Sequence, residues 1–321
     1  MSKRPSIVFM GTPDFAVASL DAILQAGYEI KAVVTVPDRQ SGRGQKIAFS
    51  PVKDYALQHN LPLLQPEKLR EETFLETLRQ LNADMFIVVA FRMLPKTVWN
   101  MPKMGTFNLH ASLLPDYRGA APINWAIING EEESGVTTFM LNERIDEGEI
   151  LLQESTPITQ NDNAGTLHDR LMLMGKDLVL RTIEGLSNNT LHPRPQPAVN
   201  TPKNAPKIFK DDCRINWESP GQAIVDFVRG MSPYPAAFME LKYPTGEIVP
   251  FKIFDVSFEK GVVDEKFSII TDQKKYLKIT TNDGFIFVNS LQMGGKRRNS
   301  IENFLIGNNI SDCKLIINKK H

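Results

Sequence analysis

The sequence has few of the residues that build metal sites and disulfide frameworks. Its 321 residues include two cysteines, Cys213 and Cys313, and five histidines. Neither cysteine has a second cysteine or a histidine at ligand spacing, so a disulfide framework is excluded and a structural zinc site is not expected. We therefore expect no metal, and a reducing cytoplasm as the compartment.

Long hydrophobic runs are also missing. No apolar stretch approaches the roughly 20 residues that span a bilayer, so no membrane partner is expected. Lys3 and Arg4 lead directly into a short apolar segment, which is not the pattern of a signal peptide. Hydrophobic residues make up 42% of the chain and charged residues 23%. These proportions are typical of a globular protein.

Several catalytic signatures are absent. The sequence contains no H-E-x-x-H, no phosphate-binding loop and no serine or cysteine in a nucleophile elbow. The turn after the first apolar segment carries Gly11 alone, where a dinucleotide site needs G-x-G-x-x-G. Metalloprotease, P-loop and covalent-hydrolase chemistry therefore have no support, and neither has a nicotinamide or flavin site.

What is present is an alternation of apolar runs and helical patterns. Apolar runs that do not alternate with polar residues occur at 6–10, 28–36 and 85–90, a short alternating apolar segment lies at 106–110, and amphipathic patterns lie between these segments. Strands buried on both faces have this character in parallel sheets. The order predicts an α/β fold, a Rossmann-like doubly wound and mostly parallel sheet, in which ligands bind at the carboxyl ends of the strands.

A proline-rich stretch marks the expected domain boundary. Residues 191–206 contain five prolines and almost nothing apolar, which predicts an extended, semi-rigid linker. We expect a catalytic domain at 1–190 and a C-terminal domain at 207–321. One helix and then short strands separated by turns predict that the latter is a small OB-like β-barrel. Residues 200–321 hold 18 Lys and Arg against 14 Asp and Glu, so the two parts carry −4 and +4.

A basic segment lies early in the chain. Residues 37–46 include Arg39, Arg43 and Lys46 together with two glycines and no apolar side chain. Such a segment cannot pack against a core and is expected to be a mobile surface loop. From the residues alone, it is either a solvated connection or an arm that grips a polyanion, since arginine binds phosphate through two hydrogen bonds.

The central stretch, residues 105–122, carries the most distinctive chemistry. A short strand ends there in a loop that is rich in proline and glycine, and Asn108 and His110 lie two apart on that strand, with their side chains on one face. An amide can donate to a developing oxyanion, an imidazole can move a proton, and Asp146 in a later turn is the candidate to orient that imidazole. The alternative is that His110 is a hydrogen-bonded core residue and Asn108 a loop anchor. We expect Asp116 and Arg118 to stabilise the loop as a pair.

The same stretch resembles a known family. Residues 107–131 read FNLHASLLPDYRGAAPINWAIINGE, which is similar to the core motif of the 10-formyltetrahydrofolate-dependent formyltransferases. Three further segments narrow the resemblance to the members of that superfamily that act on tRNA: GTPDFA at 11–16, PDRQSGRGQK with SPVK at 37–53, and KIFKDDCRINW at 207–217. Together they cover essentially the whole chain.

The resemblance implies an activity, partners and site residues. The expected reaction transfers the formyl group of 10-formyltetrahydrofolate to the α-amino group of methionine on initiator methionyl-tRNA, for translation initiation. Asn108 and His110 would stabilise the oxyanion, and His110 with Asp146 would handle the protons. The residues implied to bind the folate are Ser112, Leu113, Leu114 and Pro115, with a wall of backbone groups from Phe91, Arg92, Met93 and Leu94. The residues implied to contact tRNA are Arg39, Arg43, Lys46, Lys207 and Lys210.

Two alternatives remain open. A formyltransferase for an aminosugar nucleotide would have a comparable barrel but lack the Arg- and Gly-rich segment, and one for another small amine, glycinamide ribonucleotide, would lack the C-terminal barrel. A folate- or RNA-binding protein without catalysis would not need Asn108, His110 and Asp146 together. We expect the protein to be a monomer.

Overall fold

The computed structural model describes residues 4–41 and 46–317. The chain forms two compact units that interleave in sequence. The first comprises Met1–Pro122, Ser134–Thr156 and His168–Asn204, and the second comprises Ile123–Glu133, Pro157–Leu167 and Ala205–His321. Each unit is described by itself.

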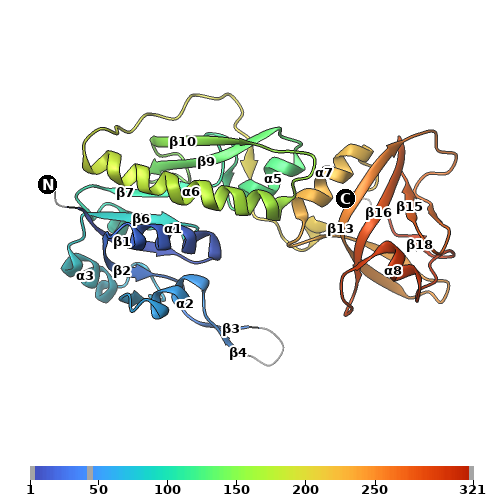
Figure 1. Ribbon diagram of the computed structural model, residues 1–321, viewed down its shortest axis with the longest axis horizontal. Coiled ribbons are helices and arrows are strands. Elements are labelled where there is room, and N and C mark those ends of the chain that lie inside the picture. Colours follow the sequence, from blue (N-terminus) through green and yellow to red (C-terminus); the bar gives the residue numbers. More distant parts are fainter. Residues whose placement is uncertain (1–3, 42–45, 318–321) are drawn as a thin grey trace. The chain divides into compact units, whose positions relative to one another are not determined.

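The first unit is built on a seven-stranded sheet, whose strands can be followed side by side in Figure 1. Strand β1 pairs in parallel with β2 and β6, β2 with β5, and β6 with β7, whereas β9 runs antiparallel to β7. In sheet order the strands are β10 (Ile150–Pro157), β9 (Glu133–Met140), β7 (Thr106–His110), β6 (Met85–Val89), β1 (Ser6–Gly11), β2 (Glu29–Val34) and β5 (Leu63–Leu64). This mixed, mostly parallel sheet confirms the predicted fold class.

The central strands are continuous apolar runs because both of their faces are covered. All six residues of β1 and all five of β6 are buried. On one face, Val8 and Phe86 pack against Phe74 and Leu78 of an amphipathic helix. The helices that belong to this unit wholly or mainly are α1 (Asp14–Gln25), α2 (Pro51–Gln58), α3 (Glu72–Leu81), α4 (Lys96–Trp99) and α6 (Ala164–Ser187).

Local sequence signals set the ends of these helices. Ser50 precedes α2, and its side chain accepts a hydrogen bond from the Lys53 amide, while Pro51 occupies the first turn, where a missing N–H costs nothing. Helix α3 ends at Asn82, whose φ of 43° is the left-handed conformation that closes many helices. Among the described residues, no helix is both long and apolar enough to cross a membrane.

The described part of the basic segment contains two short paired strands, which differs from the expected loop. Strands β3 (Arg39–Ser41) and β4 (Lys46–Ala48) pair antiparallel, with Arg39 opposite Ala48. Backbone hydrogen bonds between two short strands need no apolar side chains, so a composition that cannot form a core can still form a ribbon. Arg43 lies outside the described residues.

The second unit contains an antiparallel, barrel-like sheet, which confirms the predicted C-terminal architecture. Its strands are β14 (Ile269–Thr271), β15 (Leu277–Thr280), β16 (Gly284–Met293), β13 (Ile248–Lys260), β12 (Ala237–Lys242) and β18 (Lys314–Leu315), with β17 (Asn299–Ser300) paired to β16. The long strand β13 alternates buried and exposed residues, and its register shifts near Asp255. Such a bulge bends and twists a strand, which lets a single strand follow a curved sheet.

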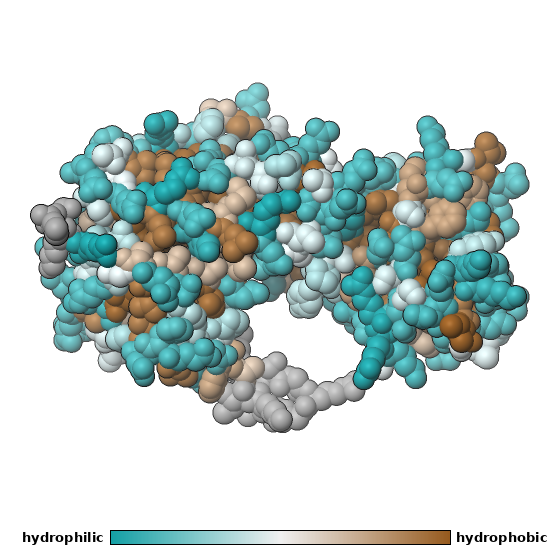
Figure 2. Space-filling view, in the orientation of Figure 1, coloured by the Kyte–Doolittle hydropathy of each residue, from teal (hydrophilic) through white to brown (hydrophobic). Residues whose placement is uncertain are grey.

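Helices close the core of the second unit. Ile224, Val228 and Met231 of α7 (Gly221–Met231) pack with inward-facing residues of β13 such as Phe251 and Ile253. Asn124 of α5 (Pro122–Ile128) donates to the carbonyl of Gly230, which ties α5 to α7. The remaining short elements of the chain are β8 (Arg118–Gly119), β11 (Asn204–Ala205), the 3₁₀ turn Asp211–Cys213 and α8 (Ile301–Leu305). The face drawn in Figure 2 is mainly hydrophilic, with hydrophobic residues interspersed.

Candidate active site

The candidate site begins at the carboxyl edge of the parallel sheet. Strands β6 and β7 are neighbours in register, with Val88 opposite Asn108 and Val89 opposite Leu109. The segment that follows β6, residues 91–94, therefore leaves the sheet beside His110. Ligands of doubly wound sheets bind at this edge, where loops rather than strands provide the polar groups.

Asn108 carries a buried polar atom with no partner. Its side chain is half-buried, and the amide oxygen Oδ1 is buried without a hydrogen bond to any described residue. Buried polar atoms are nearly always paired, so an unpaired one needs an explanation. Rotation of the amide by half a turn exchanges Oδ1 for the Nδ2 donor, so this side chain can offer either an acceptor or a donor to a ligand.

His110 is held through one ring nitrogen and faces a carboxylate through the other. It is 7% exposed, and Nε2 lies 2.8 Å from the carbonyl oxygen of Tyr117. A carbonyl can only accept, so Nε2 carries a hydrogen and, in the neutral ring, Nδ1 carries the lone pair. Nδ1 lies 3.8 Å from Oδ2 of Asp146. The lone pair of Nδ1 and the Oδ2 oxygen of Asp146 are both acceptors, so the two side chains form an ion pair only when Nδ1 carries a proton.

Asp146 sits in a strained turn between β9 and β10. Its φ of 54° is left-handed, which is uncommon for a residue with a side chain. Its Oδ2 accepts a hydrogen bond of 2.9 Å from the amide of Gly119. Gly148, two residues later, lies so close to the carbonyl of Met140 that a Cβ would overlap it. The carboxylate is therefore fixed between the histidine and the loop of residues 112–119.

That loop is pinned to the sheet by side chains that sequence patterns did not reveal. Thr137 on β9 donates to the carbonyl of Ser112 at 2.6 Å, and Gln153 on β10 donates to the carbonyl of Leu114 at 2.8 Å. The Ser112 hydroxyl donates to the Asp116 carbonyl, and Ser112 and Leu114 are both buried. Leu113 and Pro115 are half-buried, so they are the more accessible side chains of the four residues predicted to border a folate.

Residues 91–94, which follow β6 and are predicted to form one wall of the folate site, mainly present backbone groups to that site. The Arg92 guanidinium donates to the carbonyls of Pro66 and Glu67, and Leu94 is buried in the hydrophobic core. Phe91 packs against the same core, whereas Met93 is 74% exposed. Three of the four side chains, all but that of Met93, thus contact the protein, which leaves the backbone of this segment for the contacts predicted with a ligand.

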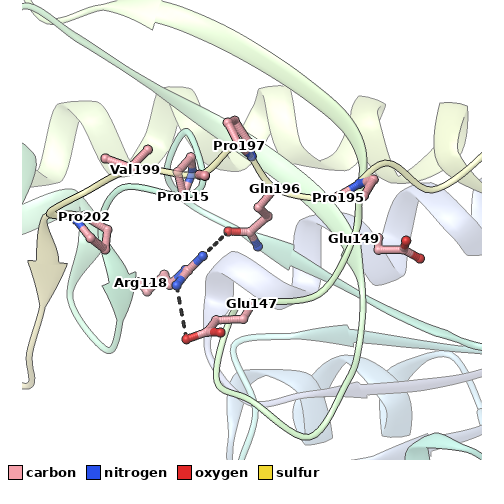
Figure 3. Close-up of a pocket in the computed structure, with 10 residues that line it drawn as sticks. Pro115, Arg118, Glu147, Glu149, Pro195, Gln196, Pro197, Val199 and Pro202 are labelled. Atoms are coloured by element: carbon pink, nitrogen blue, oxygen red, sulfur yellow. Dashed lines mark hydrogen bonds and ion pairs between the residues drawn. The ribbon is translucent and has the colours of Figure 1, made fainter.

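The proline-rich segment lies against the same site and lines a pocket of about 380 Å³, shown in Figure 3. Gln196 lies there beside Arg118, which also forms an ion pair with Glu147 at 3.2 Å. Asp116 accepts from the amide of Lys203. Asp116 and Arg118 thus bind separate parts of this segment instead of acting as a pair, and Gln196, like Thr137 and Gln153, belongs to no motif and gave no sequence signal.

The residues predicted to contact tRNA are spread over both units. Arg39 and Lys46 lie in β3 and β4 of the first unit. Lys207 and Lys210 are exposed in the second unit, and the Lys207 ammonium lies 5.3 Å from the ring centre of Phe209, itself 60% exposed. A cation beside an exposed aromatic ring suits a nucleic acid, but no described contact brings these residues to His110.

Metal ligands do not gather at the site. Across residues 4–41 and 46–317, no three His, Cys, Asp or Glu side chains are grouped as metal ligands would be. Cys213 and Cys313 are free and buried, and burial raises the pKa of each thiol. The polar groups at this edge of the sheet are instead the Asn108 amide and the facing pair of the His110 imidazole and the Asp146 carboxylate.

The fold and the site define a class of enzyme. The chain belongs to the formyl transferase family, whose model matches residues 4–183, and the model of the formyl transferase C-terminal domain matches residues 207–309. Among similar proteins is the methionyl-tRNA formyltransferase of Bacteroides thetaiotaomicron, 53% identical over 312 residues, which are 95% of this chain and 96% of that protein. The methionyl-tRNA formyltransferase of Flavobacterium johnsoniae is 48% identical over 306 residues, 95% of this chain and 97% of its own.

Solved structures share the fold at much lower identity. The sugar 3N-formyl transferase WlaRD, crystallised with dTDP and 5-N-formyl-THF, has a TM-score of 0.63 at 22% identity, over 92% of this chain and 100% of its own. HypX from Aquifex aeolicus in complex with tetrahydrofolic acid has a TM-score of 0.62 at 18% identity, over 94% of this chain and 47% of its own. At these identities the likeness describes the fold.

Proposed function

We propose that this protein transfers the formyl group of 10-formyltetrahydrofolate to the α-amino group of methionine on initiator methionyl-tRNA. The observation that carries the proposal is the cluster of Asn108, His110 and Asp146, in a chain about half identical over nearly its full length to proteins named methionyl-tRNA formyltransferase. The amide oxygen of Asn108 has no partner among the described residues, and the imidazole has one nitrogen available. A binding protein would need neither.

The residues of the site fit a formyl-bearing folate. Asn108, whose amide oxygen has no partner among the described residues, lies at the sheet edge next to the segment of residues 91–94, whose Arg92 and Leu94 side chains face the protein. Two structural neighbours were crystallised with 5-N-formyl-THF and with tetrahydrofolic acid. When bound, the folate supplies a formyl carbon attached to a nitrogen leaving group. Ser112, Leu113, Leu114 and Pro115 would border it.

Asn108 would stabilise the charge that develops on the formyl oxygen. With its Nδ2 turned toward the site, the amide donates a hydrogen bond to that oxygen as the amine attacks the carbon. A single donor of this kind contributes about 10²–10³ to the rate. The half-turn that brings Nδ2 to this place breaks no hydrogen bond between Oδ1 and a described residue.

His110 and Asp146 would move the proton that the amine must lose. Nε2 stays bonded to Tyr117, so Nδ1 is the nitrogen that accepts the proton as the new carbon–nitrogen bond forms. The imidazolium then faces the Asp146 carboxylate at 3.8 Å. Nδ1 returns the proton to the leaving nitrogen, and the ring ends neutral. One proton has passed from the amine to the leaving group.

The tRNA would be gripped by cations from both parts of the chain. We assign Arg39, Arg43 and Lys46 of the basic segment, and Lys207 and Lys210 after the proline-rich stretch, to phosphate contacts. In this proposal residues 1–190 form the catalytic domain, 191–206 the linker and 207–321 the tRNA-binding domain. The protein acts as a monomer, which light scattering with and without tRNA would test.

A second candidate is transfer to an aminosugar nucleotide. It is favoured by the fold, since structures of sugar N-formyltransferases cover 91–92% of this chain. The competing prediction is tested by offering the purified protein 10-formyltetrahydrofolate with either charged initiator tRNA or dTDP-3-aminofucose. We expect kcat/KM to be at least 10³-fold higher for the tRNA, because the cationic segments add counter-ion release only for a polyanion. Comparable or higher values for the sugar nucleotide would overturn the assignment.

A further inference from the structure

The proline-rich segment is attached to the active-site loops at two points. Ile150, at the start of β10, exchanges backbone hydrogen bonds of 2.7 and 2.8 Å with Arg194. Further along, the Lys203 carbonyl accepts from the Tyr117 amide at 2.6 Å, and the Lys203 amide donates to Asp116 at 2.9 Å. The intervening residues are therefore held beside the turn that contains Asp146.

Gln196 lies between these two points and makes three hydrogen bonds. Its Nε2 donates to the carbonyl of Asp146 at 2.8 Å and to the carbonyl of Gly148 at 2.9 Å. Its Oε1 accepts from Arg118 at 2.6 Å, as Figure 3 shows. The orientation of the amide is unambiguous, because two carbonyls require a donor and a guanidinium requires an acceptor.

These hydrogen bonds bridge the turn from its strained residue, Asp146, to Gly148 two positions later. Asp146 has a φ of 54°, and a residue with a side chain holds this conformation only when its surroundings impose it. Gln196 bridges the carbonyls at either end of the 146–148 turn, while the Asp146 carboxylate reaches the Gly119 amide on the other side. The backbone bridge and the carboxylate contact together fix Oδ2 at 3.8 Å from His110.

We propose that Gln196 is a positioning residue for catalysis: it holds the Asp146 turn so that the carboxylate faces Nδ1 of His110. The proposal deepens the proposed function, on which it rests for the identity of the reaction. It gives the proline-rich segment a role in the chemistry beyond joining two parts of the chain. Arg118 supports Gln196, since its guanidinium occupies the amide oxygen and so orients the donors toward the turn.

Two substitutions of Gln196 separate the effect of the two hydrogen bonds that it donates to the turn from the effect of the one that it accepts from Arg118. Gln196→Ala removes all three hydrogen bonds. Gln196→Glu keeps an oxygen that accepts from Arg118, but it puts a second oxygen, which cannot donate, opposite the carbonyls of Asp146 and Gly148. We expect each to lower the single-turnover formylation rate about 10- to 100-fold, since displacement of a reacting group by about 1 Å has this effect. KM for both substrates should stay within about twofold. Val199→Ala, a truncation in the same pocket with no hydrogen bond to the turn, is the matched control and should match the wild type.

A double-mutant cycle distinguishes positioning from a general loss of structure. If Gln196 acts through Asp146, Gln196→Ala should slow the Asp146→Asn variant by less than about twofold, because the group that it positions has already been lost. Additive losses would overturn the proposal, and so would a Gln196→Glu enzyme as fast as the wild type.

A second measurement needs no substrate. Hydrogen exchange of the Gly119 amide, which donates to Asp146, should speed up at least tenfold in Gln196→Ala and stay unchanged in Val199→Ala. If the wild type failed to formylate methionyl-tRNA, the proposed function would fall, and this measurement would still test the bridge that Gln196 makes. Unchanged exchange in Gln196→Ala would overturn the role of that bridge whatever the substrate.

Discussion

Replacement of Asp146 by asparagine removes one negative charge and little else. Asparagine has nearly the same shape, and its Oδ1 can still accept the hydrogen bond of the Gly119 amide that Asp146 Oδ2 accepts at 2.9 Å. The carbonyls of residue 146 and Gly148 keep their bonds to Gln196. The turn should therefore persist while the protonated form of His110 loses its counter-charge.

The size of the effect follows from the distance between the two groups. At 3.8 Å, two unit charges in an effective dielectric of about 20 attract by about 4 kcal/mol. The side chains are only 8% and 14% exposed, so screening by water reduces this value without abolishing it. Because each 1.4 kcal/mol is about tenfold in rate, we expect Asp146→Asn to slow proton transfer by about 10²–10³.

Single-turnover kinetics measure this step without interference from product release. Enzyme in excess over charged initiator tRNA, saturated with 10-formyltetrahydrofolate, would be quenched at short times and the formyl-methionine released from the tRNA. The amplitude reports bound substrate, and the rate reports chemistry. Thermal unfolding of the variant within a few degrees of the wild type would show that the turn is intact.

A rate within about fivefold of the wild type would refute the role given to Asp146. It would mean that the imidazolium forms without help from the carboxylate, or that His110 never carries the proton. A large loss of rate together with a loss of tRNA affinity would also count against it, because the carboxylate is assigned to the chemistry alone.

The other predictions concern the amide of Asn108, the cations of the second unit and the partly buried hydroxyl of Tyr55. Asn108→Ala should lower the single-turnover rate about 10²–10³-fold with tRNA affinity unchanged, and a loss below tenfold would show that Asn108 does not stabilise the oxyanion. Lys207→Ala and Lys210→Ala should each reduce the slope of log Kd against log salt for tRNA by about 1, and an unchanged slope would show that neither meets a phosphate. Tyr55 donates to Asp21 at 2.7 Å, and burial first, then this hydrogen bond, raises the pKa of the tyrosine. A raised pKa stabilises the fold fully below the unfolded value of about 10 and progressively less above it. Tyr55→Phe should therefore be less stable than the wild type in urea at about pH 8, with the difference shrinking above about pH 10, and a constant difference would contradict this linkage.

The sheet and its central polar pair were predictable because their signals are local. Continuous apolar runs such as residues 85–89 mark strands buried on both faces, and alternation along 106–110 places Asn108 beside His110. The mostly parallel class of the sheet followed from the alternation of strands and helices. Strand β9 joins the parallel strands in antiparallel orientation and so widens the sheet, but the sheet stays in the predicted class.

The contacts that complete the site were not predictable, because they join residues far apart in the chain. Gln196 reaches Asp146 across 50 positions, and Gln153 reaches Leu114 across 39. Neither glutamine stands out by composition or spacing, and a proline-rich stretch gives no sign that it will dock. The tautomer of His110 depends on the carbonyl of Tyr117, whose φ of 61° is likewise set by the folded loop.

The most direct test of the whole account is transfer of a labelled formyl group. Purified protein would be mixed with initiator tRNA charged with methionine and with folate labelled in its formyl carbon, and the amino acid would then be released and analysed. The account predicts labelled formyl-methionine in the wild type and a rate lower by about 10²–10³ when Asn108 is replaced by alanine. Protein that binds the charged tRNA and the folate but leaves the methionine unlabelled would contradict it.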